Sequence, residues 1–97
     1  MIDSEACKEV RIGIEAFNVG EYDETVAHFE EALPLAEKQD DGSTLAGQLV
    51  EAVRYYAELD ADDYPEAARS SPEFAKYKAI TLGQCVPESS ESPGVEI

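Results

Sequence analysis

The sequence predicts an all-α, single-domain protein of four to five short helices. Three segments repeat apolar residues at intervals of three and four, the spacing of one helical face, and no segment alternates as a strand would. A chain of 97 residues suffices for one small domain, which we expect to span residues 1–85. Residues 86–97 are rich in Pro, Ser and Glu. We expect them to form a flexible tail that is ordered only when something holds it.

The first helix is predicted over residues 4–18. Ser4 is a suitable N-cap, because its hydroxyl can accept a hydrogen bond from a free amide of the first turn. Gly20 can adopt the left-handed conformation that closes a helix. Ile12 adds an apolar position on a second side, so this helix needs two neighbours, or one neighbour and a ligand. Its main apolar stripe consists of Ala6, Val10, Gly13, Ile14 and Phe17.

The second helix is expected to begin near Tyr22. Pro34 lacks the amide that would bond to the carbonyl of Glu30, so the helix should kink or stop there. One more turn over residues 35–38 is the alternative. The predicted buried stripe of this helix consists of Tyr22, Val26, Phe29 and Leu33.

The third helix should begin at Ser43 or Thr44, and it has the clearest periodicity in the chain. Residues 64–69 can form a short helix. Residues 70–73, Ser-Ser-Pro-Glu, then indicate a cap and a new helix start, and the last helix is expected to run to about Gly83. The predicted buried stripe of the third helix consists of Leu45, Leu49, Ala52, Val53, Tyr56 and Leu59.

The chain is strongly acidic, with 22 Asp and Glu against 7 Lys and Arg and a net charge of −15. Such a chain repels the nucleic-acid backbone, so we expect no direct nucleic-acid partner. No apolar run is long enough to span a membrane, and the first residues do not resemble a secretory signal. We therefore predict a cytoplasmic protein. The charge itself has three interpretations: a surface that maintains solubility, adaptation to a salt-rich cytoplasm, or imitation of DNA.

Residues with catalytic or metal-binding chemistry are few. His28 is the only histidine, and it is expected to be a surface or boundary residue of the second helix. Glycines are dispersed, so no phosphate-binding loop is present. Cys7 and Cys85 lack metal-ligand spacing, and we expect two buried thiols, because a disulfide requires the terminal helices to meet and the cytosol disfavours it. We predict no catalytic, cofactor-binding or metal-binding residues.

Residues 6–38 resemble one tetratricopeptide repeat, a helix–turn–helix unit. Ile12-Gly13 is similar to the Leu-Gly pair of that family, whose glycine allows close helix packing. Residues 20–24, Gly-Glu-Tyr-Asp-Glu, are similar to its turn, and Phe29 with Ala32-Leu33 to its second helix. A degenerate second copy is predicted over about residues 46–69. The resemblance implies a helical hairpin that binds a protein partner and has no catalytic activity.

The resemblance also implies that the first helix lines the inner groove, with Cys7, Val10, Ile14, Phe17 and Asn18. Val10, Ile14 and Phe17 form an apolar strip along this helix. The apolar strip could bind a partner helix, pair with a second copy of the chain, or be covered by the last helix.

Tyr55 lies outside the stripe of the third helix and is a further candidate contact, unless it packs along its own helix near Glu51. We predict a protein–protein interaction module that binds another protein or forms a homodimer. The alternative is a small acidic inhibitor or DNA mimic, of the kind that a mobile element encodes, that occupies the nucleic-acid-binding site of another protein.

Overall fold

The computed structural model describes residues 4–86, and this part of the chain contains five α-helices, one 3₁₀ turn and no strand. The predicted all-α fold is confirmed. The predicted tail, except Val86, lies outside the described residues. The helices are α1 (Glu5–Asn18), α2 (Tyr22–Gln39), α3 (Thr44–Glu58), α4 (Tyr64–Ser70) and α5 (Pro72–Cys85), with the 3₁₀ turn η1 (Ala61–Asp63) before α4.

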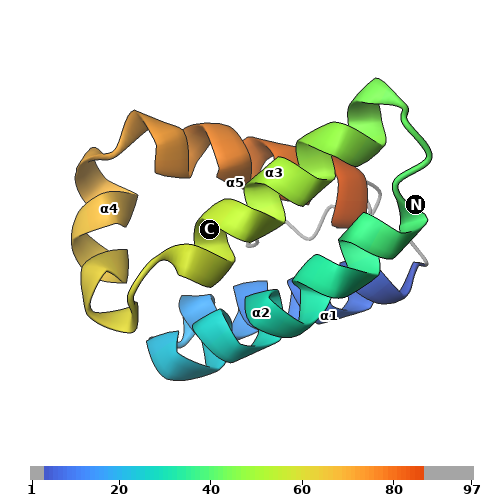
Figure 1. Cartoon of the computed structure of the whole chain (residues 1–97). Coiled ribbons are helices and arrows are strands. Elements are labelled where there is room, and N and C mark those ends of the chain that lie inside the picture. The colour runs from blue at the N-terminus through green and yellow to red at the C-terminus, as the bar shows by residue number, and fades with distance from the viewer. Residues whose placement is uncertain (1–3, 87–97) are drawn as a thin grey trace.

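The first two helices form a hairpin in which α1 and α2 lie side by side (Figure 1). Ser4 caps α1 as expected, since its hydroxyl oxygen accepts a hydrogen bond of 3.1 Å from the amide of Cys7. Gly20 has a φ of +83°, the left-handed conformation predicted for the turn. The amide of Glu21 donates to the carbonyl of Ala16 at 2.9 Å and completes the closure of the helix.

The two helices approach closely at Gly13, as its place in the repeat-like pattern predicted. A Cβ atom added to Gly13 would lie 3.0 Å from Cε2 of Phe29 and 3.6 Å from Cβ of His28. The missing side chain of Gly13 therefore leaves the space on α1 against which the Phe29 ring of α2 packs.

Replacing Gly13 with leucine is expected to destabilise the domain by about 1–3 kcal/mol, because the new side chain would occupy the space of the Phe29 ring. The matched control is Gly47→Leu on α3, where an added Cβ meets nothing within 4 Å. Urea denaturation of both variants measures the difference. Equal midpoints for Gly13→Leu and the unmodified chain would show that α1 and α2 do not meet at this glycine.

Of the two outcomes predicted at Pro34, a kink or a stop, the stop is wrong, because α2 continues to Gln39. Proline removes the hydrogen bond to the carbonyl of Glu30 and its ring crowds that carbonyl, which disfavours the helix here without forbidding it. Ala32 and Ala36, on either side of it, are both buried in the core. Pro34 itself is exposed. Packing on both sides of the proline thus stabilises the helix beyond Pro34. The alternative of one further turn over residues 35–38 is confirmed.

The third helix begins as predicted, with the hydroxyl of Ser43 accepting a hydrogen bond of 3.2 Å from the amide of Ala46. Leu49, Val53 and Tyr56 lie in the core. Leu45 is the exception, since 57% of it is exposed. It lies in the first turn of α3, where the neighbouring residue Ala46 is buried instead.

Beyond α3 the chain does not form a second hairpin like the first. Its place is taken by η1 and by α4, a helix of 7 residues, and α3 packs mainly on α2 and α5. The hydroxyl of Ser71 caps α5 by accepting from the amide of Phe74 at 3.2 Å. Helix α5 then contacts both α3 and α1, and so links the third helix to the first. None of the described helices is both long and apolar enough to cross a membrane.

Candidate functional site

The apolar strip of α1 is largely covered by the chain itself. Val10 is fully buried and Ile14 is 9% exposed. Phe17 is half-buried, and its ring centroid lies 5.6 Å from that of Phe74 on α5. Of the predicted groove residues at this end of α1, only Asn18 is exposed. Among the three occupants left open by the sequence, the last helix is the one seated on the strip.

A disulfide holds α5 to α1. Cys7 and Cys85 are both fully buried, their Cα atoms are 4.9 Å apart, and their sulfur atoms are bonded. The expectation of two separate thiols is therefore wrong, because the terminal helices do meet. A guanidinium nitrogen of Arg11 also donates to the carbonyl of Cys85 at 2.8 Å. The position of the two cysteines near opposite ends of the folded segment was the only sequence signal for this bond.

Beneath α5 lies an aromatic interior. The Tyr56 hydroxyl donates to the carbonyl of Phe74, and the Tyr64 hydroxyl donates to the carbonyl of Tyr56, each at 2.6 Å. Burial is the main cause that raises the pKa of both tyrosines far above the ordinary value, so both stay protonated. The remaining cavity of about 20 Å³, which Ile14 also lines, has room for a single water molecule.

Tyr55 lies outside this interior, as the sequence predicted, but it packs on α5 as well as on its own helix. Its ring centroid is 5.1 Å from that of Tyr77, with the ring planes inclined at 36°. Both side chains are half-buried. They form part of a surface hollow of about 250 Å³ between α3 and α5, which we call the tyrosine hollow. Its lining residues are Glu51, Arg54, Tyr55, Glu58, Glu73 and Tyr77.

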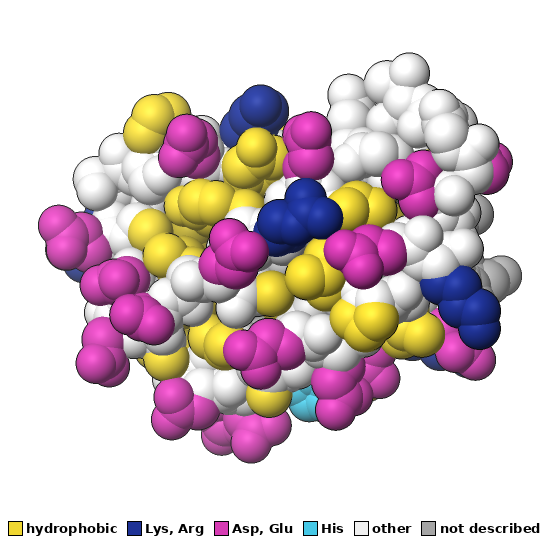
Figure 2. All heavy atoms as spheres, in the orientation of Figure 1, with side chains coloured by type: hydrophobic (Ala, Val, Ile, Leu, Met, Phe, Trp, Pro, Cys, Tyr) yellow, Lys and Arg dark blue, Asp and Glu magenta, His cyan; other side chains and the backbone are white. Residues whose placement is uncertain are grey.

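The position of Tyr55 is fixed by contacts on two sides. Its hydroxyl lies 3.3 Å from that of Ser71, the capping residue of α5. Its ring meets the ring of Tyr56 edge-on, with centroids 5.1 Å apart and planes at 77°. Figure 2 shows hydrophobic side chains gathered over the visible face of the molecule, with carboxylates distributed among them. The tyrosine hollow itself is an ordered aromatic surface whose lining also has three glutamates and one arginine.

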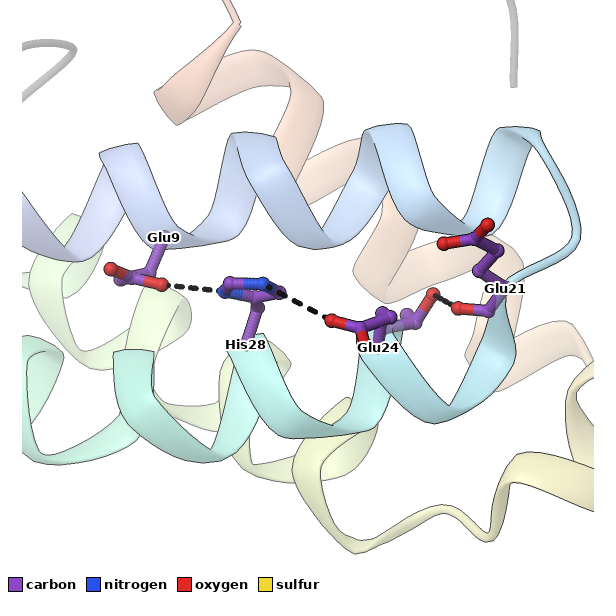
Figure 3. A network of polar contacts seen from close by, with 5 residues as sticks. Glu9, Glu21, Glu24 and His28 are labelled. Atoms are coloured by element: carbon purple, nitrogen blue, oxygen red, sulfur yellow. Dashed lines mark hydrogen bonds and ion pairs between the residues drawn. The ribbon is translucent and has the colours of Figure 1, made fainter.

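His28 joins α1 to α2 and takes the boundary position that the sequence predicted. Its Nδ1 atom lies 2.8 Å from Oε1 of Glu9 on α1, and its Nε2 atom lies 3.7 Å from Oε1 of Glu24 on α2 (Figure 3). Side-chain exposure is 28% for His28 and 25% for Glu9. The residues of this polar bridge thus hold two helices together at their rim.

A second hollow lies at the turn between α1 and α2. It is lined by residues 20–24, Ala61 and Asp62, and it contains four carboxylates and no basic side chain. Within residues 4–86, no group of three or more His, Cys, Asp or Glu side chains is arranged to hold a metal ion.

The chain was compared with protein-family models, with curated proteins and with solved structures, and none of the three comparisons gives a match.

Proposed function

We propose that this chain is a non-catalytic protein-interaction module that contacts another protein through the tyrosine hollow. The observation that carries the proposal is the half-exposed pair Tyr55 and Tyr77, which stands between α3 and α5 among charged side chains. Tyrosine is enriched among the residues that dominate binding energies, because it combines a large apolar area with a polar end. Tyr55 is also one of the contact residues predicted from the sequence.

The apolar strip of α1 is the less accessible surface. A partner helix would have to displace α5, whose Phe74 packs on Phe17 and lines a cavity with Ile14, and which is bonded to α1 through Cys7. The resemblance to a tetratricopeptide repeat remains a proposal as well. It is supported by the α1–α2 hairpin and by the close approach at Gly13. In this proposal the hairpin serves as a scaffold for the α3–α5 face.

The test compares three variants of the whole chain: Tyr55→Ala, Tyr77→Ala, and Leu45→Ala as the control on the same helix as Tyr55. Each is immobilised and exposed to an extract of the source cells, after circular dichroism has shown it to be folded. We expect a protein that is retained by the unmodified chain and by Leu45→Ala, and that both tyrosine variants lose. Sedimentation velocity of the same variants identifies the case in which this partner is a second copy. Retention that does not depend on either tyrosine would refute the proposal.

The second candidate is an acidic inhibitor that imitates nucleic acid. It is supported by the hollow at the α1–α2 turn, whose lining includes Glu21, Asp23, Glu24 and Asp62 and no basic side chain. It ranks second because carboxylates are scattered over the visible face in Figure 2, whereas imitation of a phosphate backbone calls for ordered rows.

The cytoplasmic location predicted from the sequence has one observation against it. Disulfides persist in oxidising compartments and are rare in the cytosol, and Cys7 and Cys85 form one. We therefore propose that the folded domain works in an oxidising compartment. Alkylation of free thiols in freshly lysed source cells, followed by mass spectrometry, measures the state of both cysteines and decides between the two locations.

A further inference from the structure

We infer that the tyrosine hollow binds a lysine or arginine side chain on a basic segment of the partner protein. This inference rests on the proposed function and specifies its partner. It draws on three features of the hollow: its charge, the stacking surface of its tyrosines, and the rigidity of that surface.

The charge of the hollow favours a cation. Glu51 and Glu58 on α3 and Glu73 on α5 are all exposed at its edge. The one basic residue in the lining, Arg54, lies 3.2 Å from Oε2 of Glu37 on α2, so its charge is directed to a carboxylate outside the hollow. Three carboxylates therefore outnumber the two basic side chains, Arg54 and Lys76, around the two tyrosines.

The ring surfaces favour a cation for a separate reason. The face of an aromatic ring carries partial negative charge and attracts an ammonium or guanidinium group. The chain already uses Tyr77 in this way, since Nζ of Lys76 lies 5.0 Å from its ring centroid. Lys76 is exposed, so this contact forms at the molecular surface. Tyr55, 5.1 Å from Tyr77, extends the same aromatic surface.

The hollow is also organised before a ligand arrives. The hydroxyl contact to Ser71 and the edge-on contact to Tyr56 hold the Tyr55 ring in place. A fixed ring loses little conformational freedom on binding, which favours association. A long side chain that has an apolar stem and a cationic end matches this combination of apolar ring faces and carboxylates.

The experiment uses two short peptides as probes, acetyl-Gly-Arg-Gly-amide and the same peptide with citrulline in place of arginine. Citrulline keeps the shape of arginine and removes its charge. Binding is followed at 150 mM salt by the ¹H–¹⁵N spectrum of the full-length oxidised chain. We expect the arginine peptide to shift amide signals of α3 and α5 around the hollow, and the citrulline peptide to leave them unchanged. Equal shifts from both peptides would overturn the inference.

Two pairs of variants separate the hollow from general attraction to an acidic protein. Glu51→Gln with Glu58→Gln removes two carboxylates of the hollow, and Glu5→Gln with Glu15→Gln removes two exposed carboxylates of α1. We expect the first pair to weaken binding of the arginine peptide by about fivefold to tenfold, and the second pair by less than about twofold. Equal losses would mean that only the net charge matters, and the inference would fall.

The contribution of the rings is tested by Tyr77→Leu, which keeps an apolar side chain at a half-exposed position of α5, and by Tyr55→Leu. Each is expected to weaken the arginine peptide by about threefold to tenfold while the circular dichroism spectrum stays that of the unmodified chain. Undiminished binding by either folded variant would exclude that ring from the site. If no peptide binds but a protein is still retained in a Tyr55-dependent manner, the proposed function stands and the basic partner is refuted. If the peptide binds and retention does not depend on Tyr55, only the proposed function fails.

Discussion

Replacing Val10 with aspartate is expected to remove most of the stability of this domain. Val10 is fully buried in the core, on the face of α1 that α5 helps to cover. A carboxylate there would have to be taken out of water without a partner, or be protonated at a cost, and the valine packing is lost as well. We expect a loss of about 3–5 kcal/mol, from a total that for small domains is about 5–15 kcal/mol.

The matched control is Ile12→Asp, two residues further along the same helix. Ile12 is 43% exposed, so the same charge remains in water and should change stability little. Denaturant titration followed by circular dichroism measures both variants. A folded Val10→Asp variant with the midpoint of Ile12→Asp would show that α5 leaves the apolar strip, and the strip would again be a candidate interface.

Removing the disulfide between Cys7 and Cys85 is expected to cost about 2–5 kcal/mol. The bond joins residues separated by 78 positions, so it restricts nearly the whole unfolded chain. The variant with both Cys7→Ala and Cys85→Ala measures this cost without placing a polar group in the core. Its denaturant midpoint should fall well below that of the oxidised chain, and hydrogen exchange should accelerate most in α5, which the bond holds to α1.

Dithiothreitol provides the control for that experiment. It should lower the midpoint of the unmodified chain towards that of the alanine variant and leave the variant itself unchanged. A chain in which two free thiols titrate in the absence of reductant would contradict the bond. A bonded chain with the midpoint of the alanine variant would show instead that α5 stays in place by packing alone.

Local chemistry in the sequence determined where most helices begin and how the first one ends. Ser4, Ser43 and Ser71 each accept a hydrogen bond from an amide of the first turn, as capping residues do. Gly20 takes the left-handed conformation at the end of α1. These features depend on residues only a few positions apart, and so they could be predicted without any knowledge of the fold.

Periodicity also identified which faces of the helices are apolar, but it could not show which neighbour covers each face. Leu45 belongs to the pattern of α3 and is nevertheless exposed. Pro34 favours a kink or a stop in α2, but the helix continues to Gln39 with buried alanines on either side of the proline. Both errors arise because burial depends on which helices meet in space. The spacing of apolar residues along one helix carries no information about those neighbours.

The sequence by itself thus determined an acidic all-α domain, its helix starts, and the aromatic residue Tyr55 outside the core stripe. The tertiary structure alone decided that α5 covers the apolar strip, that Cys7 joins Cys85, and that Tyr55 meets Tyr77. Each of these contacts joins α5 to a helix distant in the sequence. The position of α5 is decided by how the apolar faces of all the helices can be buried together, and no local sequence pattern specifies that arrangement.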